Sequence, residues 1–119
     1  MSVHVLIVDD DYDMRETIAD TLQDDGLTVA TAGDGVEALA YLRAQPAPRV
    51  ILLDWMMPRC DGSQFRAEQL RDPMIAAIPV VMLSADRRRE QNSQELGIDT
   101  FLAKPCNRAT LLAAIRKYC

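Results

Sequence analysis

The sequence of 119 residues lacks several features that would assign it to common classes of protein. No apolar stretch approaches the length of a membrane span, and no signal peptide is recognisable at its start. Its 3 cysteines have no CxxC spacing, which argues against a disulfide framework or a zinc site. An excess of positive charge is also missing, because the formal net charge is −5 and the pI is about 4.7. We therefore expect a cytoplasmic protein that binds neither membranes nor nucleic acid directly.

No internal repeat, low-complexity segment or linker divides the chain. Its length is near the commonest domain size, and the composition of 49% hydrophobic and 26% charged residues is typical of soluble globular proteins. We expect one domain over residues 1–119. Such a domain can act alone or as one part of a larger protein, and both arrangements fit the sequence.

Short apolar segments alternate with helical patterns along the whole chain. Most of these segments are almost continuously apolar, which is typical of strands buried on both faces of a parallel sheet. The predicted strands are Val3–Val8, Leu27–Ala32, Val50–Leu53, Pro79–Leu83 and Thr100–Ala103. Strands that alternate with helices predict a doubly wound, flavodoxin-like α/β fold with five parallel strands in the order 2-1-3-4-5 and helices on both faces.

The predicted helices have apolar stripes and recognisable boundaries. Gly26 is the expected left-handed stop of the first helix, and Asp34 with Glu37 has the spacing of a capping box at the start of the second. A third helix is expected to begin near Asp61, and Asn107 is expected to cap the last. The apolar stripes of these helices are Met14, Ile18 and Leu22; Val36, Leu39 and Leu42; Phe65 and Leu70; and Leu111, Leu112 and Ile115.

One segment departs from the alternation of strands and helices. Residues 86–95 contain no apolar residue at all, although a fourth helix belongs there by its position. A helix in this segment would have almost nothing to bury against the sheet. We therefore expect a short or irregular fourth helix.

Polar residues follow four of the predicted strands. Asp9 and Asp10 follow the first, Asp54 the third, Ser84 the fourth and Lys104 the fifth. The carboxyl ends of parallel strands lie along one edge of a sheet, so these side chains should converge there. Each of them alone is better explained as a cap, a turn residue or a surface charge. Their coincidence at one edge indicates a functional site.

The predicted cluster of carboxylates requires positive charge. Unit charges about 4 Å apart repel by ~4 kcal/mol at a protein surface, so three carboxylates need a cation to stay ionised together. Mg²⁺ suits such a site because it takes oxygen ligands and needs only a few carboxylates. Asp54 can be a ligand, a nucleophile or a structural cap. It is best placed to accept a phosphoryl group as nucleophile, because it stands alone at the end of the middle strand.

These residues resemble those of the receiver domain of two-component response regulators, over the entire chain. The motifs that carry the resemblance are Val8-Asp9-Asp10, the stretch from Asp54 to Gly62, Ser84-Ala85 and Lys104-Pro105, in the family's order. The resemblance implies signal transduction through an aspartyl phosphate, with a histidine kinase or a histidine phosphotransfer protein as donor and a downstream protein as target. It implies no classical enzyme activity. The domain would catalyse its own phosphotransfer from phosphohistidine and a slow autodephosphorylation.

By this resemblance, Asp54 is the phosphoacceptor and shares a Mg²⁺ ion with Asp9 and Asp10. Mn²⁺ is a possible substitute for Mg²⁺. The backbone carbonyl of Met56 would be a further ligand, so its apolar side chain is no objection.

The remaining polar residues have implied roles as well. Ser84 and Lys104 would grip the phosphoryl oxygens after transfer, and the peptide between Lys104 and Pro105 would be cis. Ser84 and Phe101 would form the switch pair of the family. Phe101 lacks a phenol hydroxyl, so it could take part in the switch only through its packing. A role as an ordinary core aromatic fits it equally well.

Two departures from the family pattern have consequences. Cys106 stands where the family usually has a large apolar residue, which would loosen the start of the last helix. Met56 and Asp86 occupy positions that flank the path of the hydrolytic water in the family. Because the apolar side chain of Met56 cannot orient that water, we expect slow autodephosphorylation.

Three other functions are weaker matches to the sequence. A nucleotide- or flavin-binding domain needs backbone amides of small residues after the first strand, where Asp9, Asp10 and Asp11 would repel a phosphate. An aspartyl-phosphate hydrolase of another fold would have an Asp-x-Asp motif, which is absent around Asp54. A pseudo-receiver that binds partners without phosphorylation stays the alternative to a phosphorylated receiver domain.

Overall fold

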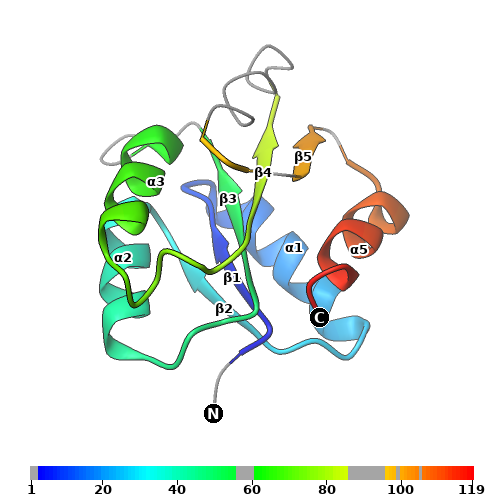
Figure 1. Cartoon of the computed structure of the whole chain (residues 1–119). Coiled ribbons are helices and arrows are strands. Elements are labelled where there is room, and N and C mark those ends of the chain that lie inside the picture. The colour runs from blue at the N-terminus through cyan, green and yellow to red at the C-terminus, as the bar shows by residue number, and fades with distance from the viewer. Residues whose placement is uncertain (1–2, 56–60, 86–95, 99, 105) are drawn as a thin grey trace.

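The computed structural model of the chain describes residues 3–55, 61–85, 96–98, 100–104 and 106–119. Strands and helices alternate along these residues (Figure 1). The strands are β1 (Val5–Val8), β2 (Val29–Ala32), β3 (Val50–Asp54), β4 (Val80–Ser84) and β5 (Thr100–Ala103). The described helices are α1 (Tyr12–Asp24), α2 (Gly35–Ala44), α3 (Gly62–Arg71) and α5 (Arg108–Arg116). Among the described residues, none of the helices combines the length and the apolar character that crossing a bilayer requires.

The strands form one parallel sheet in the order β2-β1-β3-β4-β5, which confirms the predicted fold. β1 pairs with β2 on one side and with β3 on the other, so the direction of winding reverses between β1 and β3. Every residue of β1, β3 and β4 is buried, whereas the edge strands β2 and β5 are partly exposed. Ligands of such sheets bind outside the carboxyl ends of the strands at this reversal.

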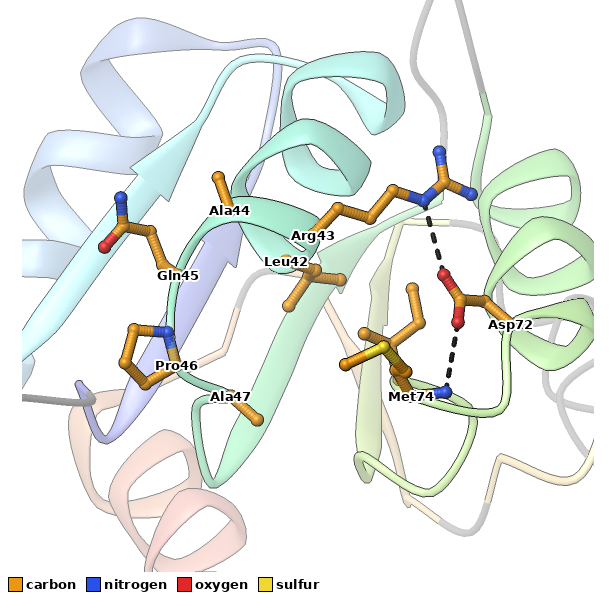
Figure 2. A pocket seen from close by; sticks show the side chains of 9 residues that line it. Leu42, Arg43, Ala44, Gln45, Pro46, Ala47, Asp72 and Met74 are labelled. Carbon is orange, nitrogen blue, oxygen red and sulfur yellow. Dashed lines mark hydrogen bonds and ion pairs between the residues drawn. The ribbon is translucent and has the colours of Figure 1, made fainter.

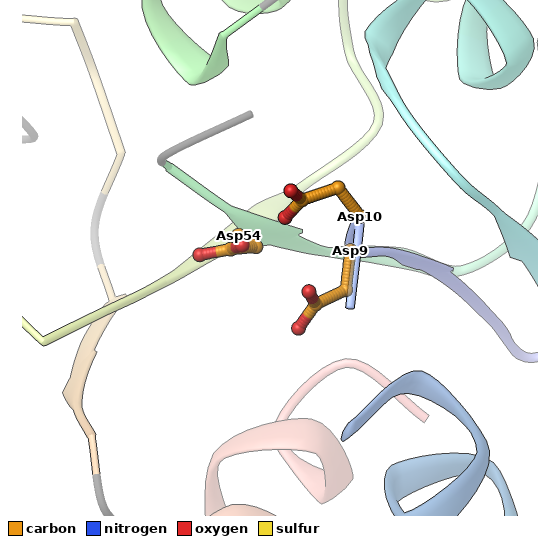
Figure 3. Close-up of side chains that lie close together, drawn as sticks. All are labelled: Asp9, Asp10 and Asp54. Atoms are coloured by element: carbon orange, nitrogen blue, oxygen red, sulfur yellow. The ribbon is translucent and has the colours of Figure 1, made fainter. Parts of the chain in front are cut away.

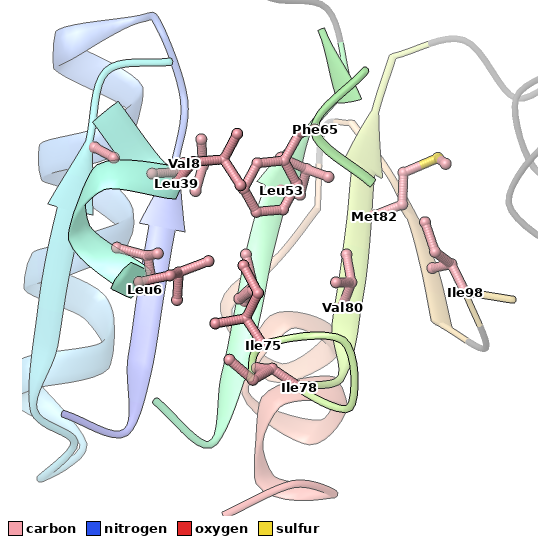
Figure 4. Close-up of a cluster of buried hydrophobic side chains, with 14 of the residues drawn as sticks. Leu6, Val8, Leu39, Leu53, Phe65, Ile75, Ile78, Val80, Met82 and Ile98 are labelled. Carbon is pink, nitrogen blue, oxygen red and sulfur yellow. The ribbon is translucent and has the colours of Figure 1, made fainter. Parts of the chain in front are cut away.

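The sheet separates two hydrophobic clusters because successive strand residues point to opposite faces. Leu53 belongs to the cluster under α2 and α3, where it lies near Phe65 (Figure 4). The preceding residue, Leu52, belongs to the cluster on the other face, together with Ile18 of α1 and Ile115 of α5. Both faces of the central strands are therefore covered, and their polar groups can reach solvent only at the strand ends.

Capping side chains define the starts of α2 and α3. Asp34 Oδ1 accepts a hydrogen bond from Glu37 N at 2.9 Å, as predicted, but the Glu37 carboxylate accepts from Gly33 N at 3.1 Å. The reciprocal bond of the predicted capping box is therefore displaced by one residue. At α3 the box is complete, because Asp61 Oδ1 accepts from Gln64 N at 2.9 Å and Gln64 Oε1 accepts from Asp61 N at 3.0 Å.

Two further helix boundaries agree with the sequence-based prediction. Gly26 follows α1 with a φ of 86°, in the left-handed region that glycine adopts at low cost. The Asn107 side chain accepts a hydrogen bond from Thr110 N at 2.8 Å and begins α5. Local residues thus fix the end of α1 and the start of α5.

The predicted inward faces of the helices are wrong at three residues. Met14, Val36 and Leu70 are 36%, 50% and 47% exposed. In α3, Arg66 and Gln69 are buried in place of Leu70, with only 7% and 0% of their surface exposed. Apolar periodicity missed these two positions because their side chains are polar and find their hydrogen-bond partners inside the protein.

Several predictions concern residues that lie outside the described part of the chain. The short or irregular fourth helix was predicted for residues 86–95, which are not described. Met56, Asp86 and Pro105 are also outside it, so the carbonyl ligand, the position flanking the hydrolytic water and the cis peptide all stay predictions.

Candidate functional site

The carboxyl ends of four strands bring the predicted site residues to one edge of the sheet. Asp54 is the last residue of β3 and Ser84 is the last residue of β4. Asp9 directly follows β1, and Lys104 directly follows β5. The strand ends are held in register, since Lys104 N donates a hydrogen bond to Ser84 O at 2.9 Å. The sheet therefore assembles a polar site from residues that are far apart in the sequence.

Asp9, Asp10 and Asp54 form a cluster of carboxylates (Figure 3). One carboxylate oxygen from each residue lies within 4.8 Å of the other two. Asp9 and Asp54 are buried, with 1% and 6% of their surface exposed, whereas Asp10 is exposed. The cluster is thus closed toward the core and open to solvent on the side of Asp10.

Lys104 supplies positive charge to this cluster. Its Nζ atom lies 3.3 Å from Asp54 Oδ1 and 3.6 Å from Asp9 Oδ2. Ser84, which is 1% exposed, lies beside these residues at the end of the neighbouring strand. One ammonium group cannot neutralise three carboxylates, so the described residues of the site carry an excess of negative charge.

This excess of negative charge affects the protonation of Asp54. Burial and the neighbouring charge of Asp9 raise the pKa of the Asp54 carboxyl to about 6, although the Lys104 ammonium group acts in the opposite direction. Burial has this effect because it removes water from around the charged form. Ionising the Asp54 carboxyl therefore costs free energy unless further positive charge enters the site.

The donor atoms of the cluster fit a hard divalent cation. Asp9 Oδ2 is buried and makes no hydrogen bond within the described part of the chain, although it forms an ion pair with the Lys104 ammonium group. Mg²⁺ and Mn²⁺ both prefer carboxylate and carbonyl oxygens, and Mg²⁺ needs only a few of them because it keeps bound water. Asp9, Asp10 and Asp54 are the described residues that can hold such an ion.

Phe101, the second residue of the predicted switch pair, lies in β5 on the side of α2 and α3. It is partly buried, stands opposite Met82 of β4 and packs against the hydrophobic cluster on that face. The ring therefore contacts the core in this arrangement. Its role as a switch stays a prediction.

Two contacts that support the site were missing from the sequence-based prediction. Arg15 Nη1 donates a hydrogen bond to Asp9 O at 2.9 Å, and the Arg15 guanidinium lies 5.3 Å from the centre of the Tyr12 ring. Trp55 is 2% exposed and packs against Gly62, where a Cβ atom would overlap the indole ring. The position of Arg15 in the first turn of α1 does not by itself indicate its contact with Asp9 O, because that contact depends on the side-chain conformation. The approach of Trp55 to Gly62 has no local signal in the sequence.

Two cavities in the described part of the chain have none of the three clustered carboxylates in their lining. A cavity of about 370 Å³ lies where β3 and β4 begin, at the opposite edge of the sheet, beside the ion pair of Arg43 Nε with Asp72 Oδ2 at 3.4 Å (Figure 2). A smaller cavity of about 110 Å³ lies between α1 and α5, where Met14, Lys104 and Cys106 line it.

Comparison with known proteins identifies similar chains. The profile of the response regulator receiver domain matches residues 5–116. The phosphate regulon transcriptional regulatory protein PhoB of Escherichia coli (strain K12) is 36% identical over 118 residues, which are 98% of this chain and 51% of that protein. The chain thus spans about half the length of the curated relatives it matches.

Solved structures share the fold over nearly the whole chain. The chemotaxis protein CheY4 of Vibrio cholerae superposes with a TM-score of 0.89 at 32% identity, and the alignment covers 100% of both chains. The phosphorylated cyanobacterial phytochrome response regulator RcpA superposes with a TM-score of 0.81 at 29% identity, covering 98% of this chain and 91% of that one.

Proposed function

Because the chain belongs to the response regulator receiver domain family, we propose that it accepts a phosphoryl group on Asp54. The main support is the position of this carboxylate, which ends β3 beside Asp9 and has Lys104 Nζ 3.3 Å away. One of the similar structures is of a phosphorylated response regulator. We propose that residues 1–119 form a single receiver domain.

In the proposed reaction, a carboxylate oxygen of Asp54 attacks the phosphorus atom of a phosphohistidine. The new O–P bond forms as the N–P bond breaks, and the departing imidazole nitrogen keeps the bonding electron pair. Lys104 then pairs with phosphoryl oxygens, and the Ser84 hydroxyl donates a hydrogen bond to one of them. Hydrolysis of the aspartyl phosphate by water returns the protein to its initial state.

The reaction is proposed to depend on Mg²⁺. Asp9, Asp10 and Asp54 would hold the ion through carboxylate oxygens, and Met56 would add its backbone carbonyl. When bound there, the ion supplies the positive charge that offsets the carboxylates and the phosphoryl oxygens. Mn²⁺, which takes the same oxygen ligands, is expected to substitute for it.

The partners are proposed from the family and from the charge of the chain. Receiver domains are phosphorylated by histidine kinases, and we propose a histidine kinase or a histidine phosphotransfer protein as the donor here. The matched PhoB is named a transcriptional regulatory protein, and this chain corresponds to half of it. With a net charge of −5, these residues are proposed to pass the signal on by contacting protein, not nucleic acid.

The test is incubation with a small phosphodonor such as acetyl phosphate, followed by intact mass spectrometry. A phosphoryl adduct is expected with Mg²⁺, and none is expected with EDTA or in Asp54→Asn. Asp20→Asn is the matched control, because it removes one exposed carboxylate outside the cluster and should leave the adduct unchanged.

Two results would contradict the proposal. An adduct that persists in Asp54→Asn would place the phosphoryl group on another residue. No adduct with either acetyl phosphate or a phosphorylated histidine phosphotransfer domain would favour a pseudo-receiver that only binds partners.

The stability of the aspartyl phosphate is proposed to depend on Met56. Its apolar side chain cannot orient the hydrolytic water, so the phosphorylated protein should decay slowly. Decay is measured by mass spectrometry after removal of the phosphodonor. A longer lifetime in Met56→Ala would contradict this expectation.

A further inference from the structure

The inward face of α3 carries a buried polar pair, Arg66 and Gln69. They are 7% and 0% exposed, at positions where a helix that covers a sheet normally places apolar side chains. Arg66 Nη1 donates a hydrogen bond to Gln69 Oε1 at 2.8 Å, so each side chain orients the other. Burying such groups is costly unless they are hydrogen-bonded, and therefore their partners define what the pair does.

The pair binds backbone carbonyls of two separate turns. Gln69 Nε2 donates to Ile75 O and Ile78 O, both at 2.9 Å, in the turn that leads to β4. Arg66 donates through Nε to Leu96 O at 3.1 Å and through Nη2 to Gly97 O at 3.3 Å, just before β5. We call Arg66, Gln69 and these four carbonyls the Arg66 clamp.

The other end of α3 is tied to the proposed phosphoacceptor. Gly62 N donates to Trp55 O at 2.9 Å, and the Trp55 ring packs against Gly62. Trp55 directly follows Asp54 and donates from its own N to Leu83 O at 3.2 Å. The first turn of α3 therefore follows the position of β3 at Asp54.

The Arg66 clamp completes a closed path of contacts that begins and ends at Asp54. From Asp54 this path leads through Trp55 and α3 to Arg66. From Arg66 it continues to the turn at Leu96 and Gly97. The chain then runs through β5 to Lys104, whose Nζ lies 3.3 Å from Asp54 Oδ1. A phosphoryl group added at Asp54 Oδ1 would need the place that the Lys104 ammonium group holds in this contact.

From this closed path of contacts we propose that Arg66 is a positioning residue. It couples the turn before β5 to whether Asp54 carries a phosphoryl group. A group added to Asp54 displaces Lys104 outward, and the clamp resists the accompanying movement of β5. The edge position of β5 suits such movement, because β5 is paired to β4 alone within the described sheet and is only partly buried. The inference rests on the proposed function of Asp54 and adds a residue that contacts neither metal nor phosphoryl group.

The test measures binding of beryllofluoride, a phosphoryl mimic, with Mg²⁺ by isothermal titration calorimetry. Arg66→Met removes the fork of donors while keeping an unbranched apolar side chain, and it should tighten binding roughly fivefold or more. Arg66→Lys keeps the charge but loses the planar fork, so it should shift binding in the same direction and serves as the second variant if Arg66→Met does not fold. Arg71→Met is the matched control on the exposed side of α3 and should stay within about twofold of the unmodified protein.

The change in hydrogen exchange on adding beryllofluoride is a readout that a purely structural role of Arg66 would not produce. In the unmodified protein, beryllofluoride should increase exchange of the amides at 96–98 as the clamp loosens. In Arg66→Met these amides should already exchange fast and should not respond further.

Each outcome decides between the two proposals. Tighter binding in both Arg66 variants, with the loss of the exchange response, supports the clamp. Binding in these variants that equals or is weaker than that of the unmodified protein overturns the clamp and leaves the proposed function standing. If the unmodified protein does not bind beryllofluoride with Mg²⁺, the proposed function fails and the clamp inference fails with it.

Discussion

Asp54 lies in surroundings that oppose its charged form. Burial, together with the charge of Asp9, raises the pKa of its carboxyl from 3.8 to about 6. The folded protein therefore holds this proton over a pH range in which the unfolded chain releases it. By linkage, the preferential protonation of Asp54 in the folded state contributes stability that is fully present below about pH 4. This contribution is lost as the pH rises through about 6.

Replacement of Asp54 by asparagine should therefore stabilise the metal-free protein, and more so at higher pH. In EDTA we expect the gain in the free energy of unfolding to grow between about pH 4.5 and about pH 7.5, reaching roughly 2 kcal/mol. Urea denaturation at the two pH values measures it. Asp20→Asn is the control and should differ from the unmodified protein by less than about 0.5 kcal/mol. A gain from Asp54→Asn that is the same at both pH values would contradict the raised pKa.

Gly62 is required by the close approach of Trp55. A Cβ atom at this position would overlap the indole ring, which is itself buried. We expect Gly62→Ala to lower the free energy of unfolding by roughly 2–4 kcal/mol, measured by urea denaturation. Replacing Trp55 by leucine in the same protein should recover part of the loss. A cost below about 0.5 kcal/mol would show that the ring can move aside.

Among the elements, α3 departs most from its sequence-based prediction. Its start was predicted correctly near Asp61, because capping residues act locally. Its inward face was predicted only at Phe65. Leu70 satisfied the apolar pattern but lies at the surface, and Arg66 took an inward place because backbone carbonyls from a distant turn satisfy its donors. Such partners lie about 30 residues away along the chain and leave no periodic signal.

The two apolar residues of α3 should differ sharply in their contribution to stability. Phe65→Ala empties space in a fully buried part of the core and should cost about 3–5 kcal/mol in the free energy of unfolding. Leu70→Ala, at a position that is 47% exposed, should cost less than about 1 kcal/mol. Chemical denaturation of both variants compares them directly. Equal losses would contradict the orientation of α3 described above.

At the scale of the whole molecule, strand order and site assembly could be predicted because both follow from alternation. Buried apolar runs indicate parallel strands, and parallel strands bring their carboxyl ends to one edge. Asp9, Asp54, Ser84 and Lys104 were placed together on this ground, and the fold brings them there. The contact of Arg15 with the backbone at Asp9 depends on side-chain conformation, which no pattern of apolar residues encodes.

Divalent cations should stabilise the whole domain through this site. Binding to the folded state alone adds about 2.7 kcal/mol when Mg²⁺ is present at about 100 times its Kd, which raises the Tm by roughly 10 °C. Differential scanning fluorimetry with Mg²⁺ and with EDTA measures the shift. Asp9→Asn and Asp10→Asn should each reduce it strongly, whereas Asp13→Asn, outside the cluster, should retain it. An undiminished shift in the first two variants would place the ion elsewhere.

The contact between Trp55 and Gly62 also has an optical consequence. The chain contains a single tryptophan, and it lies one residue beyond Asp54 with 2% of its surface exposed. All indole emission of these 119 residues therefore originates beside the carboxylate cluster. The unlabelled protein thus contains its own spectroscopic probe, and stopped-flow fluorescence can follow ion entry and modification of Asp54 in real time.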